Sequence, residues 1–142
     1  MNSFDMRLAA KSHNEAFARN VVASFAVEIS PTLEEINDIK TAVSEAVTNC
    51  VVHAYNKDGN GIVEIECKID EKERSIEIVV RDSGKGIADV KQAVEPFFTT
   101  SPEDERSGMG FTIIETFMDE MNVESTPGKG TVVRMKKVMS KC

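Results

Sequence analysis

A carboxylate and an amide stand four residues apart in the run EAVTN, which begins at Glu45 and ends at Asn49. On a helix, that spacing places both side chains on one face, a turn apart. A carboxylate can take a proton from an attacking hydroxyl group or water molecule. A neutral amide oxygen can ligate Mg²⁺ beside a polyphosphate. The same pair is also typical of an ordinary solvated helix face, so its interpretation depends on the motifs that accompany it.

A second carboxylate, Asp82, begins the run DSGKG directly after alternating apolar residues. The period of two predicts a strand that ends at Asp82. Gly84 and Gly86 permit positive φ angles and a close backbone approach in the following loop. A carboxylate at a strand end can accept a hydrogen bond from the amino group of adenine, which favours adenine over guanine. For this motif alone, a turn capped by Asp is the common alternative.

Two further runs contain glycine, SGMG at residues 107–110 and GKGT at residues 128–131. Apolar residues at helical spacing follow Gly110, so the first run predicts a helix start whose free amide groups suit phosphates. The polar stretch at about 97–108 lacks apolar periodicity and predicts a lid that orders over a bound nucleotide. The sequence contains neither a P-loop nor a dinucleotide-binding fingerprint. Together the four motifs predict a site for Mg-ATP.

The helix that carries the first motif has a start that can be read from the sequence, a capping box of Thr32 and Glu35. A second capping box, of Ser12 and Glu15, predicts an earlier helix. Apolar periodicity predicts strands around 4–8, 62–69, 75–82, 122–126 and 131–138, and helices near 88–94 and 110–121. These elements predict an α/β fold in which a mixed, mainly antiparallel sheet is covered by helices on one face.

The composition predicts one compact domain over residues 1–142, with a short tail at about 139–142, because 142 residues with 41% hydrophobic content can bury a single core. Three cysteines without metal-ligand spacing predict a reducing, cytoplasmic location. A net charge of −7 argues against direct binding of nucleic acid. The polar N-terminus and the absence of a long apolar run predict no signal peptide and no membrane contact.

In order and spacing, the four motifs resemble the N, G1, G2 and G3 boxes of the GHKL ATPase superfamily. Three runs are more specifically similar to the anti-sigma-F factors of endospore-forming bacteria: VSEAVTN at 43–49, FTT at 98–100 and ERSGMGFT at 105–112. The likeness extends from about Phe4 to Val138. It implies the two-layer α/β sandwich of the GHKL type and an ATP-dependent protein-serine kinase. It also implies a homodimer that sequesters a sporulation sigma factor and phosphorylates an anti-anti-sigma factor.

The resemblance also implies roles for single residues. Glu45 would orient or deprotonate the partner's serine hydroxyl group, and Asn49 would ligate Mg²⁺. Asp82, aided by a water near Thr131, would bind adenine. Arg106 in the lid would neutralise the moving phosphoryl group. The other positions assigned to nucleotide binding are Gly84, Gly86, Thr99, Ser107, Gly108, Met109 and Gly110.

Two other functions stay open. A histidine kinase catalytic domain fits the motifs, although a phospho-accepting helix pair would require a longer chain. A nucleotide-gated binding module without transfer also fits, although it does not need a base at Glu45. The first helix carries Glu15 and Arg19 one turn apart, and its exposed side is a candidate partner surface. Cys50 and Lys129 have no predicted role.

Overall fold

The computed structural model describes residues 1–54, 60–84, 86 and 110–140, in which one sheet is packed against helices. The elements are β1 (Asn2–Ala9), α1 (Asn14–Ala26), η1 (Val27–Ile29), α2 (Leu33–Asn49), η2 (Cys50–Ala54), β2 (Ile62–Asp70), β3 (Ser75–Asp82), α4 (Gly110–Phe117), β4 (Glu120–Thr126) and β5 (Gly130–Val138). The five strands have the order β1-β2-β3-β5-β4. Every pairing between them is antiparallel, so this sheet is antiparallel throughout and not mixed.

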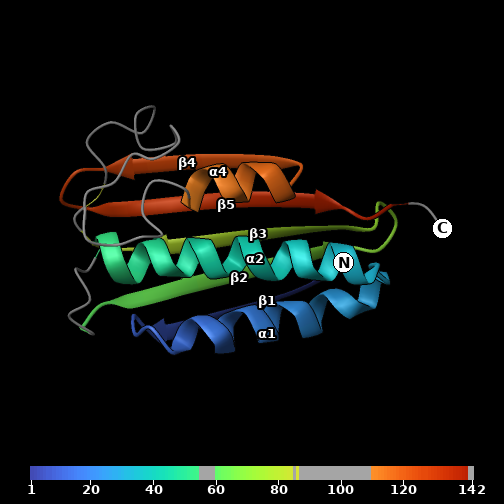
Figure 1. Cartoon of the computed structure of the whole chain (residues 1–142), viewed down its shortest axis with the longest axis horizontal. Helices are drawn as coiled ribbons and strands as arrows, with labels where there is room; N and C mark the ends of the chain where they lie inside the picture. Colours follow the sequence, from blue (N-terminus) through green and yellow to red (C-terminus); the bar gives the residue numbers. More distant parts are fainter. Residues whose placement is uncertain (55–59, 85, 87–109, 141–142) are drawn as a thin grey trace.

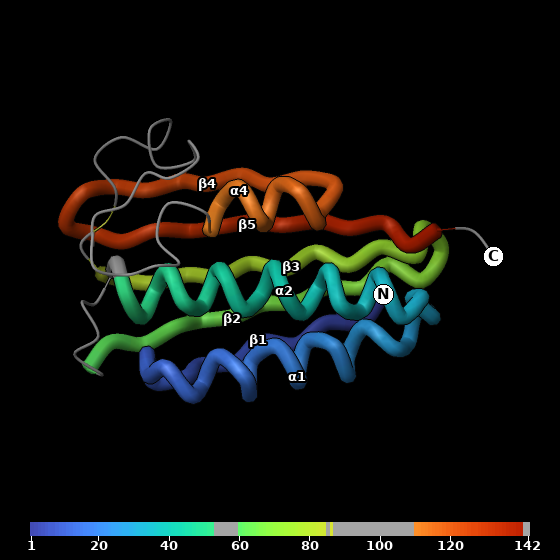
Figure 2. The backbone as a smooth tube through the Cα atoms, in the orientation of Figure 1, coloured from blue at the N-terminus to red at the C-terminus, as the bar shows by residue number. Residues whose placement is uncertain are grey.

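Helices α1, α2 and α4 lie on one face of the sheet (Figure 1). This arrangement confirms the predicted two-layer α/β sandwich. The end of α2, the end of β3 and the turn between β4 and β5 lie at the same end of the molecule, on the left of Figure 2. Antiparallel pairing of β3 with β5 therefore brings the second and fourth motifs together, and α2 places the first motif at the same end of the molecule (Figure 2). The helix predicted near 88–94 lies outside the described residues.

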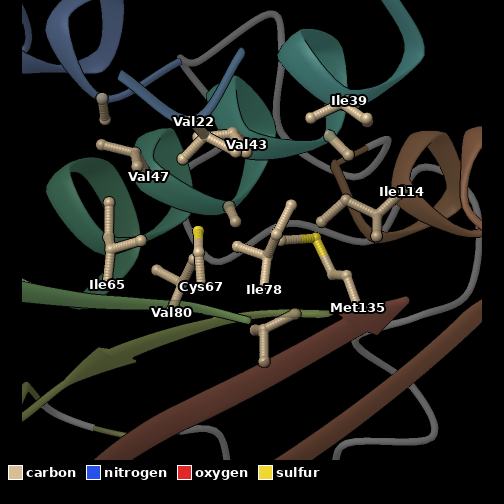
Figure 3. Packing of buried hydrophobic residues seen from close by; sticks show 14 of the residues in the cluster. Val22, Ile39, Val43, Val47, Ile65, Cys67, Ile78, Val80, Ile114 and Met135 are labelled. Carbon is tan, nitrogen blue, oxygen red and sulfur yellow. The ribbon is translucent and has the colours of Figure 1, made fainter. Parts of the chain in front are cut away.

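The core lies between α2 and the middle of the sheet, where Val43 and Val47 face Ile65, Ile78 and Val80 (Figure 3). Each of these side chains is at most 1% exposed. Burial of one such side chain stabilises the fold by about 1.5–3 kcal/mol. The core thus fixes α2 on the sheet and, with it, the end of the helix that carries the first motif.

The predicted capping box at the start of α2 is confirmed. The Thr32 hydroxyl group accepts a hydrogen bond from the Glu35 amide at 3.1 Å, and the Glu35 carboxylate accepts one from the Thr32 amide at 2.8 Å. The second oxygen of Glu35 accepts a hydrogen bond from the Ser140 amide at 2.7 Å. Met139 beside it is only 3% exposed. Met139 and Ser140 therefore still pack against the domain, although they lie in the tail predicted at about 139–142.

The predicted capping box of Ser12 and Glu15 is wrong. His13 occupies the N-cap position with φ −73° and ψ −14° and makes no side-chain cap hydrogen bond. An N-cap residue usually has an extended backbone, and this one is helical. The Glu15 carboxylate instead pairs with Arg19 at 2.6 Å. Helix α4 is also shorter than predicted, because the chain re-enters the sheet where the Asp119 amide donates to the Lys136 carbonyl group at 2.9 Å.

None of the helices in the described ranges is long and apolar enough to cross a membrane.

Candidate functional site

A row of polar side chains marks the end of the sheet where the motifs meet. Asp82 of β3 is the register partner of Thr131 of β5, which is in turn the partner of Ser125 of β4. Residues aligned across strands point to the same face of a sheet. The aligned set two residues further in is apolar: Val80, Val133 and Val123. The core therefore ends, and a polar surface begins, at Asp82, Thr131 and Ser125, which we call the polar row.

The carboxylate of Asp82 is held by three donors. One oxygen accepts from the amides of Gly84 at 2.9 Å and Thr131 at 3.2 Å. Among the described residues, the other oxygen accepts only from the Cys50 thiol, at 3.5 Å. Burial raises the pKa of Asp82, and these three hydrogen bonds oppose the rise. An ionised carboxylate can accept about four hydrogen bonds, so the second oxygen has room for a donor such as an adenine amino group.

Cys50 contacts the site, contrary to the expectation that it has no role. It is 4% exposed and begins the π-helical turn η2 directly after Asn49. Burial, followed by the nearby charge of Asp82, raises the pKa of this thiol well above its ordinary value. The thiol therefore keeps its proton and acts as a donor. No local pattern in the sequence reveals a contact with a residue 32 positions away.

Two glycines bring the loop after β3 close to the β4–β5 turn. Gly86 has φ +76°, and a Cβ atom there would lie 2.3 Å from the Thr126 carbonyl oxygen. Gly130 has φ +123°, and a Cβ atom there would lie 2.1 Å from the Asp82 carbonyl oxygen. Real Cβ atoms do not approach other atoms this closely. Only glycine fits at either position, as the sequence indicated for Gly86.

The amide of Asn49 lies directly against the start of α4. A Cβ atom at Gly110 would lie 2.9 Å from Asn49 Oδ1 and 3.0 Å from Nδ2. Asn49 Nδ2 is buried and has no hydrogen-bond partner among the described residues. An unsatisfied buried donor costs about 1–3 kcal/mol. A ligand that supplied an acceptor here, such as a phosphate oxygen, would remove that cost.

The same amide fits the magnesium ion that the sequence predicts. Rotation of the amide by half a turn would present its oxygen, a ligand that Mg²⁺ accepts. The described residues contain no cluster of three or more His, Cys, Asp or Glu side chains that could hold a metal ion. Protein sites for Mg²⁺ often provide one or two ligands and leave the rest to substrate phosphates and water. Asn49 is suited to that kind of site.

Glu45 lies one turn before Asn49 on α2 and is 6% exposed. Its neighbour Ser44 is 7% exposed and lies 3.5 Å from an Arg19 guanidinium nitrogen. Arg19 and Glu15 thus pair with each other on the side of α1 that faces α2, and their side chains are 35% and 18% exposed. They do not mark the exposed side of α1, the candidate partner surface.

Several predicted site residues lie outside the described residues: Thr99, Arg106, Ser107, Gly108, Met109 and the rest of the lid at 97–108. Of the predicted positions that the structure describes, Asn49 and Gly110 form one group. Asp82, Gly84 and Thr131 form a second, and Cys50 joins the two because it follows Asn49 and contacts Asp82. Ser125 also belongs to the second group, although no motif in the sequence points to it.

The sheet, the helices on one face and this polar end define a histidine kinase-like ATPase domain. The family model of that description matches residues 8–137. A Mycobacterium tuberculosis structure with RsbU and RsbW domains has the same fold, with a TM-score of 0.70 and 20% identity, over 99% of this chain and 33% of that one. The catalytic domain of histidine kinase ThkA has a TM-score of 0.58 at 16% identity, over 98% and 97% of the two chains.

Closer relatives are named anti-sigma F factor. The protein of Caldanaerobacter subterraneus is 56% identical over 140 residues, which are 99% of this chain and 96% of the relative. That of Clostridium novyi is 56% identical over 136 residues, or 96% and 94% of the two chains. That of Geobacillus kaustophilus is 51% identical over 140 residues, or 99% and 94%. This chain belongs to the anti-sigma F factor family, which confirms the resemblance found in its motifs.

Proposed function

We propose that this chain is an anti-sigma factor with protein-serine kinase activity. It binds Mg-ATP at the polar end of the sheet and transfers the terminal phosphoryl group to a serine of an anti-anti-sigma factor. As a homodimer it binds and inhibits a sporulation sigma factor. Membership of the anti-sigma F factor family supports the sigma-binding part. The observation that carries the nucleotide part is the buried Asn49 Nδ2 beside Gly110, which has no hydrogen-bond partner among the described residues and lies one turn after the buried Glu45.

Asp82 recognises the base in this proposal. Its partly satisfied carboxylate accepts a hydrogen bond from the adenine amino group, next to Thr131 in the polar row. Gly84 and Gly86 keep the loop close to that carboxylate. Asn49 holds the magnesium ion, which when bound would offset the negative charge of the phosphates. The amides at Gly108, Met109 and Gly110 receive the phosphates.

Glu45 orients or deprotonates the serine hydroxyl group of the partner protein. A positioned general base contributes about 10²–10⁴ in rate. Arg106 neutralises the transferring group, and Thr99 and Ser107 complete the contacts with the nucleotide. The chain acts in the cytoplasm, which suits its two buried free thiols, Cys50 and Cys67. It contacts its partners as proteins, without direct contact with nucleic acid or membrane.

Incubation of the purified chain with labelled ATP, Mg²⁺ and a candidate anti-anti-sigma factor tests the proposal. We expect phosphoserine on the partner and no label on the chain itself. The variant Glu45→Gln, which keeps size and polarity, serves as the matched control. Phosphohistidine on this chain would favour the histidine kinase alternative. ATP binding without any transfer would favour a nucleotide-gated binding module.

A further inference from the structure

We propose that Ser125 is a specificity-determining residue that holds the Thr131 hydroxyl group as a hydrogen-bond acceptor, so that this end of the sheet selects 6-aminopurines over 6-oxopurines. The inference rests on the proposed function, because it concerns the site assigned to the ATP base. It goes beyond that function by giving a role to Ser125, whose hydroxyl group sets the orientation of the Thr131 proton and, through it, the choice of base.

The argument begins with the protons of two hydroxyl groups. Ser125 Oγ lies 3.0 Å from the Gly130 carbonyl oxygen and 2.8 Å from Thr131 Oγ1. A carbonyl oxygen can only accept, so the single proton of Ser125 is donated to Gly130. The hydrogen bond between the two hydroxyl groups must then use the proton of Thr131. Thr131 Oγ1 therefore has no proton left to donate, and it can only accept from a further group.

This constraint holds because the backbone fixes all three groups. Ser125 and Thr131 are register partners across β4 and β5, and Gly130 is the first residue of β5. Thr131 is 6% exposed, and its own amide donates to Asp82. Rotation of the Thr131 hydroxyl group away from Ser125 would give up the 2.8 Å hydrogen bond of a buried side chain, which disfavours that orientation about five- to a hundredfold.

Two neighbouring acceptors then face the base, the Asp82 carboxylate and the Thr131 hydroxyl oxygen. The amino group of adenine offers two N–H donors, which match such a pair. A 6-oxopurine presents a carbonyl oxygen at the same position, so it would place acceptor against acceptor. A site built to pair with a donor strongly rejects an analogue that lacks it. Without Ser125, the Thr131 proton is free to turn toward a 6-oxo group, and part of the discrimination is lost.

The experiment compares the affinities of ATP and inosine triphosphate for the full chain with Mg²⁺ present. Inosine triphosphate carries the 6-oxo group without the additional amino group of guanine. We expect Ser125→Ala to reduce the preference for ATP about threefold to tenfold, the effect of one hydrogen bond. Ser125→Thr keeps the hydroxyl group in a residue that suits a strand, and should keep the preference. In a Thr131→Val background, Ser125→Ala should change the ratio no further.

The outcomes separate this inference from the proposed function. A merely structural role of Ser125 would lower both affinities equally, and an unchanged ratio in Ser125→Ala would overturn the inference alone. If that variant does not fold, Ser125→Cys, with its weaker donor, should give an intermediate ratio, and a wild-type ratio there would overturn it as well. Failure of the unmodified chain to bind ATP would overturn the proposed function and the inference with it.

Discussion

The close contact between Gly110 and Asn49 predicts that a single methyl group at the start of α4 disturbs nucleotide binding without unfolding the protein. In Gly110→Ala, the new Cβ atom would lie 2.9 Å from Asn49 Oδ1, 3.0 Å from Nδ2 and 3.3 Å from Cγ. All three atoms belong to a side chain, so the amide can move aside. Gly110 does not have a positive φ, and alanine suits a helix at least as well as glycine. The free energy of unfolding should therefore change by less than about 1 kcal/mol.

Affinity should respond much more strongly than stability. A hydrogen bond or ligand contact to a charged group is worth about 1.5–3 kcal/mol. Displacement of the Asn49 amide should therefore weaken Mg-ATP binding roughly ten- to hundredfold. Calorimetric titration with ATP and Mg²⁺, repeated in EDTA, measures the effect. The loss should be smaller in EDTA if the amide holds the ion.

A double-mutant cycle tests whether Asn49 transmits the effect. Asn49→Ala removes the three atoms nearest to the new methyl group. Gly110→Ala should then cost almost nothing further, which gives a coupling energy close to the full effect of the single variant. Wild-type affinity in Gly110→Ala, or strictly additive losses in the double variant, would refute the reasoning. A large loss of stability would show that the helix itself, and not the amide, moves.

Four further predictions follow from the site. Glu45→Gln should bind Mg-ATP normally but lose about 10²-fold or more in phosphoryl transfer; a wild-type rate would remove Glu45 from the chemistry. Burial raises the pKa of Asp82, and the hydrogen bond from adenine needs the ionised carboxylate, so ATP affinity should fall as the pH drops through that raised pKa. Asp82→Asn should abolish this pH dependence and should lower ATP affinity about tenfold at neutral pH. In Gly130→Ala the new Cβ atom would meet backbone atoms, so this variant should lower both the melting temperature and the affinity for ATP. Gly128→Ala, with φ +79° but nothing within 4 Å, should cost only about 1–2 kcal/mol of stability. Equal losses of ATP affinity in the two variants would contradict this reasoning. Asn49→Ala should raise the free energy of unfolding of the nucleotide-free chain by about 1 kcal/mol, and a lower value in chemical denaturation would show that its amide is satisfied.

The sequence predicted the elements where a local rule governs them. The period of two in β3 and the capping box at Thr32 and Glu35 depend on neighbours a few residues away, and both are confirmed. The box at Ser12 and Glu15 satisfies the same local rule and still does not form. There Glu15 pairs with Arg19 one turn on, and the backbone at His13 is already helical. The Glu15 side chain has two possible partners nearby, the backbone at Ser12 and the Arg19 side chain, and the sequence alone does not show which of them it binds.

The site itself was predicted less completely, because its missing parts depend on register. Cys50 reaches Asp82 from a π-helical turn, and a helical wheel based on a regular helix does not anticipate that turn. Ser125 enters the polar row because β4 pairs with β5 in one particular alignment. A shift of that pairing by one residue would turn Ser125 to the other face of the sheet. No motif in the sequence encodes that alignment.

The two halves of the site differ in how they are prepared for a nucleotide. In the polar row, Asp82, Thr131 and Ser125 already make hydrogen bonds to protein groups, and the second oxygen of Asp82 keeps room for one more donor. In the proposed site, these acceptors are therefore held in position for the base before a nucleotide binds. At the phosphate end, the buried Asn49 amide has an unsatisfied donor within the described chain, a cost that the empty protein bears and a bound ligand removes. Any group that binds the folded chain and not the unfolded one raises its stability. If the proposed function is right, nucleotide should thus stabilise this fold chiefly through the contact at Asn49, and the choice of base should depend on the polar row.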